Sequence, residues 1–223
     1  VAHEIGNPVT GIACLAQNLK AEYKDPDIIE ASSLILTQTQ RITNIVRSLV
    51  GFARTDSHMT SSSYSAVHLK STIEEAISLL KLSGGKEYQF DNFCPEELNV
   101  RGNAQRLMQV FVNLLSNARD ASPIDSQIMI EAHQNGSFIH IEIEDFGTGL
   151  PEGTIRDNLF EPFVTTKETG KGTGLGLALV HGIIGEHGGK IQLMDKADYD
   201  QGRGVIVQIS LPAWVNDEEE IVA

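Results

Sequence analysis

The sequence places a histidine beside a carboxylate, and an amide one helical turn further on, in residues 3–8 (HEIGNP). If Ile5 takes the first position of a heptad, His3 and Asn7 fall on the side of the helix that faces away from the apolar seam. Glu4 can accept a hydrogen bond from one ring nitrogen, which would fix the tautomer and make the other nitrogen the better nucleophile. The pattern predicts an exposed imidazole prepared for attack, and an ordinary surface histidine is the alternative.

Two asparagines, Asn113 and Asn117, lie four residues apart in a helical pattern that runs from 104 to 121. They fall on a different face from the apolar stripe of this helix. Asparagine is a poor helix former, so a pair at this spacing calls for a functional reason. A carboxamide oxygen can ligate Mg²⁺, and its NH₂ group can donate to a phosphate. The pair is therefore a candidate metal and phosphate site, with an exposed pair on a solvated face as the alternative.

A strand-like alternation in residues 138–149 (FIHIEIEDFGTG) puts Asp145 on the apolar side of the strand. A buried carboxylate is costly unless it is paired, and no lysine or arginine nearby in sequence is an obvious partner. A ligand donor such as the exocyclic amine of adenine would satisfy it. Gly147 and Gly149 allow the backbone to turn tightly beneath a flat ring. The alternative is an aspartate that only starts a turn.

A second glycine-rich run, residues 170–177 (GKGTGLGL), leads into a helical pattern. Glycine amides at a helix N-terminus make a phosphate site. The run is not a Walker A loop, because Thr165 stands where the first glycine of that motif belongs, and it does not match GxGxxG. We therefore expect phosphate binding here, and a flexible glycine loop without a ligand is the alternative.

Residues 1–57 carry the period of two helices, with a break at residues 25–27 (DPD). Apolar residues recur every seven positions in both helices, which is typical of a coiled-coil seam. The positions are Ile5, Ile12 and Leu19 with Leu15 in the first helix, and Ile28, Ile35, Ile42 and Leu49 in the second. Two short helices cannot bury such seams alone, so we expect a dimeric four-helix bundle. Packing against the rest of the same chain is the alternative.

Residues 56–66 are rich in serine and threonine without an apolar period, which indicates a domain boundary. Helix and strand patterns then alternate over 67–212, and we expect an α+β chain whose second part is an α/β sandwich, one mixed sheet covered by three helices. The expected helices are 73–82, 104–121 and 173–187, and the expected strands are 88–93, 98–100, 128–132, 138–143, 191–194 and 205–211. The strand-free stretch 147–172 is long enough to be a ligand lid. The expected organisation is a hairpin at 1–57, a linker at 58–66, a catalytic domain at 67–215 and an acidic tail at 216–223.

The composition of the chain argues against several classes of partner and site. A net charge of −13 without a basic stripe argues against nucleic acid. The two cysteines, Cys14 and Cys94, form no metal-binding pattern, and no apolar run is long enough to span a membrane. Because Val1 already lies inside a helical pattern, we expect a fragment that resides in the cytoplasm. Any anchor in the inner or plasma membrane would lie in segments outside this sequence.

Together these segments resemble the sensor histidine kinase family over essentially the whole chain. The five motifs, in family order, are HEIGNP (the H box), NLLSNARDA (the N box), DFGTGL (a first glycine box), FEPFVTT (the F box) and GKGTGLGLAL (a second glycine box). The resemblance implies a dimeric helical hairpin followed by a Bergerat-type ATP-binding domain that uses ATP and Mg²⁺. It also implies a response regulator receiver domain as the partner that accepts the phosphoryl group.

By the same resemblance, His3 accepts the phosphoryl group, Glu4 assists as a base, and Asn7 matches the residue that orients water to dephosphorylate the regulator. Asn117 would ligate Mg²⁺, Asn113 would lie near the phosphates and Asp145 would read adenine. The glycine-box residues implied in nucleotide binding are Gly147, Gly149, Lys171, Gly172, Thr173, Gly174, Leu175 and Gly176.

One departure from the family pattern is Asp120, which stands where many members carry a basic residue; Arg119 is its neighbour. Two other functions remain as alternatives. A hydrolytic ATPase of the same superfamily would carry glutamate at the position of Asn113, since an amide cannot deprotonate water. A non-catalytic dimeric scaffold would use nucleotide only for structure.

Overall fold

The structure is a computed structural model that describes the chain except residues 1, 54–63, 83–87, 168–171, 200–201 and 216–223. In parts of the first two helices, including residues 2–6, it describes the backbone but not the side chains. Lys171, most of the expected linker and all of the expected acidic tail therefore lie outside the described residues.

The predicted break at residues 25–27 separates two antiparallel helices, α1 (Ala2–Glu22) and α2 (Pro26–Ala53). Asp25 caps the second helix, because its Oδ1 accepts a hydrogen bond from the backbone N–H of Asp27 at 2.9 Å. Proline suits the first position of a helix, where its missing N–H costs nothing. The structure thus confirms the helical hairpin.

The two helices meet through small and polar residues rather than through the large apolar ones. Among the hairpin residues whose side chains the structure describes, Val9, Ala16, Ser32 and Thr39 are buried. Most of the described large seam residues stay exposed, with 47% exposure at Ile12, 66% at Leu15, 41% at Leu19, 40% at Ile35 and 42% at Ile42, whereas Ile28 is half-buried. The hairpin therefore presents an apolar face that its own chain does not cover.

A five-stranded sheet forms the frame of the second part, in the order β2-β4-β5-β7-β6. The pair β2–β4 is parallel and the other pairs are antiparallel, so the sheet is mixed as expected. The strands are β2 (Gln89–Asn92), β4 (Gln127–Asn135), β5 (Phe138–Glu144), β6 (Lys190–Asp195) and β7 (Val205–Pro212). A two-residue turn at Gly136 joins β4 to β5, which confirms the predicted hairpin.

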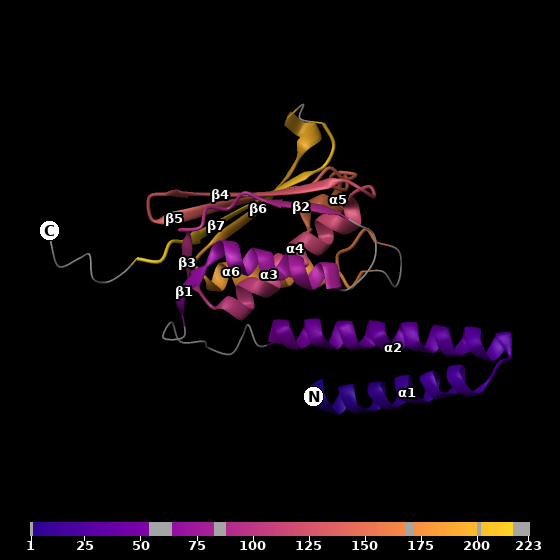
Figure 1. Cartoon of the computed structure of the whole chain (residues 1–223). Coiled ribbons are helices and arrows are strands. Elements are labelled where there is room, and N and C mark those ends of the chain that lie inside the picture. The colour runs from indigo at the N-terminus through magenta and orange to yellow at the C-terminus, as the bar shows by residue number, and fades with distance from the viewer. Residues whose placement is uncertain (1, 54–63, 83–87, 168–171, 200–201, 216–223) are drawn as a thin grey trace.

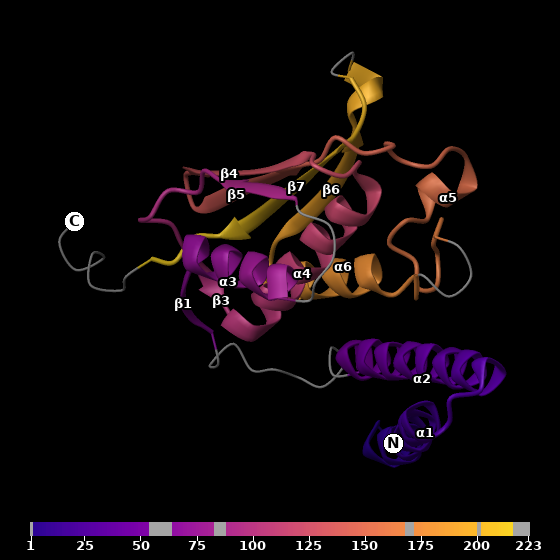
Figure 2. The same ribbon diagram turned by 45° about the vertical axis from the view of Figure 1, so that its right-hand side comes forward.

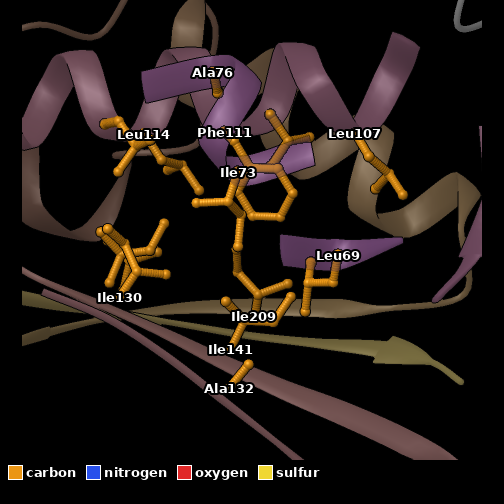
Figure 3. Close-up of a cluster of buried hydrophobic side chains, with 14 of the residues drawn as sticks. Leu69, Ile73, Ala76, Leu107, Phe111, Leu114, Ile130, Ala132, Ile141 and Ile209 are labelled. Carbon is orange, nitrogen blue, oxygen red and sulfur yellow. The ribbon is translucent and has the colours of Figure 1, made fainter. Parts of the chain in front are cut away.

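Three helices, α3 (Leu69–Leu82), α4 (Ala104–Ala121) and α6 (Gly176–Glu186), cover one face of this sheet (Figures 1 and 2). The core lies between these helices and the sheet and is centred on Phe111 of α4, which is 1% exposed (Figure 3). Alternate residues of β5 and β7 point into it, including Ile141 and Ile209, which are partners across the two strands. The predicted sandwich is confirmed. The hairpin lies beside this helical layer, where α2 contacts α6 (Figures 1 and 2).

Two of the differences between the predicted and the observed elements have local causes. The strand β1 (Ser65–His68), which pairs with β3 (Asn99–Gly102), was not predicted, because its short sequence buries little more than Val67. The helix α6 begins at Gly176 and not at Thr173, because Gly174 has a φ of +65° that no α-helix accommodates. The long loop also contains the short helix α5 (Thr154–Asp157), and a 3₁₀ turn, η2 (Lys196–Tyr199), follows β6.

Among the helices in the described part of the chain, none combines the length and the apolar character that a membrane span requires.

Candidate functional site

The helix α4 carries the asparagine pair on the side that faces the second glycine box. Its apolar stripe is buried, and Asn103 caps its N-terminus by accepting the N–H of Arg106 at 3.1 Å. Asn113 and Asn117 are half-buried. The NH₂ group of Asn113 donates to the carbonyl of Gln109 at 2.8 Å, which leaves its Oδ1 directed away from that bond. The Oδ1 of Asn113 is therefore available as a ligand at the edge of the helix, whereas the Oδ1 of Asn117 accepts a hydrogen bond from the ammonium of Lys167 at 3.4 Å.

Asp145 is buried at the end of β5, with 5% exposure, as the alternation predicted. Its Oδ1 accepts backbone hydrogen bonds from Gly147 at 2.9 Å and from Val205 at 3.1 Å. No hydrogen bond reaches its second oxygen, Oδ2, from any residue that the structure describes. Burial raises the pKa of this carboxyl above its usual value, although the two backbone N–H groups act in the opposite direction.

The buried Lys196 forms its ion pair with Glu144 and not with Asp145. The ammonium of Lys196 lies 2.5 Å from Glu144 Oε1 and 3.6 Å from the centre of the Phe146 ring. The buried carboxylate thus keeps one oxygen for a donor that the described protein does not supply. An amine of a flat heterocycle can donate a hydrogen bond to Asp145 Oδ2, as the sequence suggested.

The first glycine box is held tightly between α4 and the end of β6. A Cβ on Gly147 would lie 2.7 Å from the backbone oxygen of Ala121, so only glycine fits against this helix. Gly149 has a φ of +87°, and a Cβ there would lie 2.9 Å from Asp195 Oδ2. Asp195 is buried and accepts the N–H of Leu150 at 2.7 Å, which fixes the loop. The loop beside Asp145 therefore has little freedom to collapse.

Sequence reasoning missed Asp195 and Gly204 as parts of this site. Gly204 has a φ of +128°, and a Cβ on it would overlap the carbonyl of Asp145. A glycine pair around Arg203 just before a strand and an acidic residue at the end of a strand are the only local signals for them. Their contacts join segments 45 and 60 residues apart, so spacing alone could not reveal them.

The second glycine box brings the N-terminus of α6 against the asparagine pair. Gly176 approaches Asn113 so closely that a Cβ would lie 3.2 Å from its Oδ1. The N–H of Phe163 donates to the carbonyl of Gly174 at 2.8 Å, and the N–H of Leu175 donates to Thr173 Oγ1 at 3.3 Å. Gly172 packs on Thr165, because a Cβ on Gly172 would lie 2.8 Å from Thr165 Oγ1. The structure therefore gathers the N box and the described glycine-box residues on one side of the domain.

The predicted phosphoacceptor lies on the separate hairpin. His3 and Glu4 belong to α1, but their side chains are outside what the structure describes. Asn7, one turn further along, is exposed as expected. The contact of α2 with α6 places the hairpin beside the helix whose N-terminus carries the second glycine box.

The chemical groups gathered at this site fit a nucleotide bound with magnesium. Asp145 offers an acceptor at one end of the site, the amide oxygens of Asn113 and Asn117 are hard ligands suited to Mg²⁺, and the glycines allow backbone N–H groups to approach phosphates.

Comparison with known proteins decides the family. Residues 1–58 match the family described as His Kinase A (phospho-acceptor) domain. Residues 102–215, about half of the chain, match the family described as Histidine kinase-, DNA gyrase B-, and HSP90-like ATPase. The chain belongs to the sensor histidine kinases.

Similar proteins include other sensor histidine kinases. The chain is 34% identical to the nitrogen regulation protein NtrY of Azorhizobium caulinodans over 96% of this chain and 28% of that protein. It is 31% identical to the sensory histidine kinase/phosphatase NtrB of Azospirillum brasilense over 96% of this chain and 54% of that protein. The chain thus spans from about a quarter to just over half of the length of these relatives.

Solved structures share the fold of this histidine kinase. Full-length ShkA in complex with AMPPNP aligns with a TM-score of 0.74 and 20% identity over 96% of this chain and 45% of that chain. The nucleotide-free catalytic domain of the histidine kinase ThkA aligns with a TM-score of 0.56 and 29% identity over 67% of this chain and 97% of that chain. Both alignments agree with the sandwich of Figure 1.

Proposed function

We propose that this chain is the catalytic core of a sensor histidine kinase that autophosphorylates His3 from Mg-ATP and then transfers the phosphoryl group to an aspartate of a response regulator. The observation that carries the proposal is the buried carboxylate of Asp145, which has one oxygen without a described donor. It lies in the same domain as the gathered asparagines and glycine boxes. The family of the chain and the AMPPNP complex of ShkA support nucleotide binding.

In this proposal each group of residues has one task. Asp145 accepts a hydrogen bond from the adenine amine, and Asn113 with the backbone around Gly172, Gly174 and Gly176 holds the phosphates. Asn117 would hold Mg²⁺, which when bound neutralises charge on the phosphates. Gly147 and Gly149 shape the adenine end, and the backbone of Thr173 and Leu175 with the ammonium of Lys171 completes the phosphate end.

The transfer itself requires positioning more than covalent chemistry. The imidazole of His3 attacks the γ-phosphorus in line, and the bond to the β,γ-bridging oxygen breaks, which releases ADP. Glu4 accepts the proton from the other ring nitrogen. The hairpin must approach the ATP-binding domain for this step, and we propose the segment 55–66 as the hinge, most of which lies outside the described residues. The described chain resumes at Tyr64, whose ring stacks on His187 at 4.7 Å.

The same histidine would serve the regulator. The phosphoryl group passes from His3 to a receiver-domain aspartate, and Asn7 orients a water molecule that hydrolyses the aspartyl phosphate to aspartate and inorganic phosphate. The exposure of Asn7 suits contact with a second protein. The relative NtrB is named as both a sensory histidine kinase and a phosphatase, which supports both activities here.

The uncovered apolar face of the hairpin supports a homodimer, in which two hairpins form a four-helix bundle. Replacing Leu15, 66% exposed in the monomer, by glutamate would bury a charge in each copy of the interface. We expect Leu15→Glu to weaken dimerisation by at least about 100-fold, since two buried leucine side chains are lost. Sedimentation equilibrium measures this, with Gln17→Glu on the opposite side of the helix as the charge-matched control. Dimers of equal strength in both variants would contradict the proposal.

The experiment that tests the function follows labelled ATP over time with the wild-type chain. A kinase core accumulates label on protein up to about one phosphoryl group per site and releases little inorganic phosphate, since its amide at position 113 cannot activate water. Continuous phosphate release without labelled protein would establish a hydrolytic ATPase instead. Nucleotide binding with neither outcome would establish a scaffold.

A further inference from the structure

A lysine that no motif singled out reaches the N box from the loop after the F box. The Nζ of Lys167 lies 2.7 Å from Asp120 Oδ2 and 3.4 Å from Asn117 Oδ1, although about 50 residues separate it from both. Asn117 is the residue proposed to ligate Mg²⁺. A cationic ammonium thus lies at the oxygen that the metal would use.

The path of this side chain is shaped by the second glycine box. A Cβ on Gly172 would lie 3.0 Å from the Cβ and 3.1 Å from the Cδ of Lys167, so the aliphatic stem runs against the bare backbone of this glycine. Thr165 Oγ1 accepts the N–H of Lys167 at 3.1 Å and fixes the start of that path. The glycine box therefore directs the ammonium of Lys167 toward α4.

The ion pair between Lys167 and Asp120 is weak enough for the ammonium of Lys167 to change partners. The side chains of Lys167 and Asp120 are 34% and 37% exposed, and pairs at such positions contribute little to stability. A triphosphate carries several negative charges and attracts the ammonium more strongly than one carboxylate does. Asp120 keeps a second cation, because Arg119 Nη2 lies 3.4 Å from its Oδ1.

We propose that Lys167 binds the phosphates of the nucleotide and that Asp120 pairs with its ammonium when no nucleotide is bound. While the site is empty, Lys167 neutralises Asp120 and lies at Asn117 Oδ1. When Mg-ATP binds, the ammonium moves to the triphosphate and leaves that oxygen to the metal, since two cations at one amide oxygen repel each other. Asp120 and the triphosphate then compete for one ammonium. This inference rests on the proposed function, because it requires Mg-ATP beside Asn117.

The test is a double-mutant cycle on nucleotide affinity, measured by isothermal titration calorimetry. We expect Lys167→Gln to weaken Mg-ATP binding about tenfold, the effect of one charge-assisted contact. Asp120→Asn should tighten it about threefold, because the competitor is removed. The double variant should match Lys167→Gln, since Asp120 acts only through Lys167. Affinity for AMP, which lacks the distal phosphates, should be unchanged in all three and so shows that each variant is folded.

Several results would overturn the inference. One is an equal Mg-ATP affinity for Lys167→Gln and the wild type. Another is that Asp120→Asn tightens binding equally when Lys167 is absent, because Asp120 would then repel the nucleotide directly. An equal loss for AMP and ATP would show a structural role. Lys81→Gln, an exposed substitution on α3, is the charge control. If the wild type itself bound no Mg-ATP, the proposed function would be wrong as well. If the wild type binds Mg-ATP and the variants do not behave as expected, only the role of Lys167 is wrong.

Discussion

Replacing Asp145 by asparagine is expected to weaken ATP binding by about 100-fold while leaving the fold intact. The asparagine oxygen can still accept the N–H groups of Gly147 and Val205, which now bond to Asp145 Oδ1 at 2.9 and 3.1 Å. Its NH₂ group would then replace Oδ2 and present a donor to the amine of adenine, which is also a donor. Calorimetry with ATP and with tripolyphosphate separates the two ends of the site, because only ATP should lose affinity.

The same substitution should not lower stability at neutral pH. Burial raises the pKa of the Asp145 carboxyl, so the folded chain disfavours its ionised form. This penalty is absent below the ordinary aspartate pKa of about 3.9 and complete once the pH exceeds the raised pKa of the folded state. Without nucleotide, Asp145→Asn should therefore unfold at the same or a higher temperature than the wild type at pH 8. The difference should shrink as the pH is lowered, and a variant much less stable at pH 8 would contradict this.

Replacing Gly174 by alanine should disrupt the phosphate end of the site. A Cβ there would lie 2.7 Å from Phe163 Cα and would overlap the adjoining carbonyl, so the hydrogen bond from Phe163 to Gly174 cannot persist. The φ of +65° adds about 1–2 kcal/mol of strain for any residue with a Cβ. Because the N-terminus of α6 begins two residues later, its backbone N–H groups should shift. We expect ATP affinity to fall by at least about 30-fold, roughly 2 kcal/mol.

Gly136→Ala is the matched control for this prediction. Gly136 has a similar φ of +60°, but a Cβ there meets nothing within 4 Å, and it lies in the turn between β4 and β5. It should lose only the strain energy, measured as a lower free energy of unfolding in urea, and its ATP affinity should equal that of the wild type. If both variants bound ATP alike, close packing of the second glycine box would have no part in the site.

The sequence predicts best what depends on local periodicity. The alternation in β5 placed Asp145 on the buried side, and the stripe in α4 separated its apolar residues from Asn113 and Asn117; the structure confirms both. The turn at Gly136 followed from its local sequence. These features depend only on residues that are neighbours within one helix, strand or turn, so the spacing of those residues is enough to predict them.

Contacts between distant segments could not be predicted in this way. Gly204 approaches Asp145 because β7 pairs with β5, and Lys167 reaches Asn117 because a long loop returns to α4. Nothing in their local sequence fixes either register. The start of α6 was misplaced for a different reason, since the positive φ of Gly174 is a tertiary requirement. The orientation of His3 stays a prediction, as its side chain is outside the described residues.

The central claim is that the imidazole of His3 receives the γ-phosphoryl group. The most direct measurement is to locate the phosphate on the wild-type chain after incubation with Mg-ATP, by peptide mapping that avoids acid. We predict one phosphoryl group on the peptide that contains His3, labile in acid and stable in base, and none in His3→Gln. Equal labelling of His3→Gln, or phosphate on another residue of the wild type, would contradict the account.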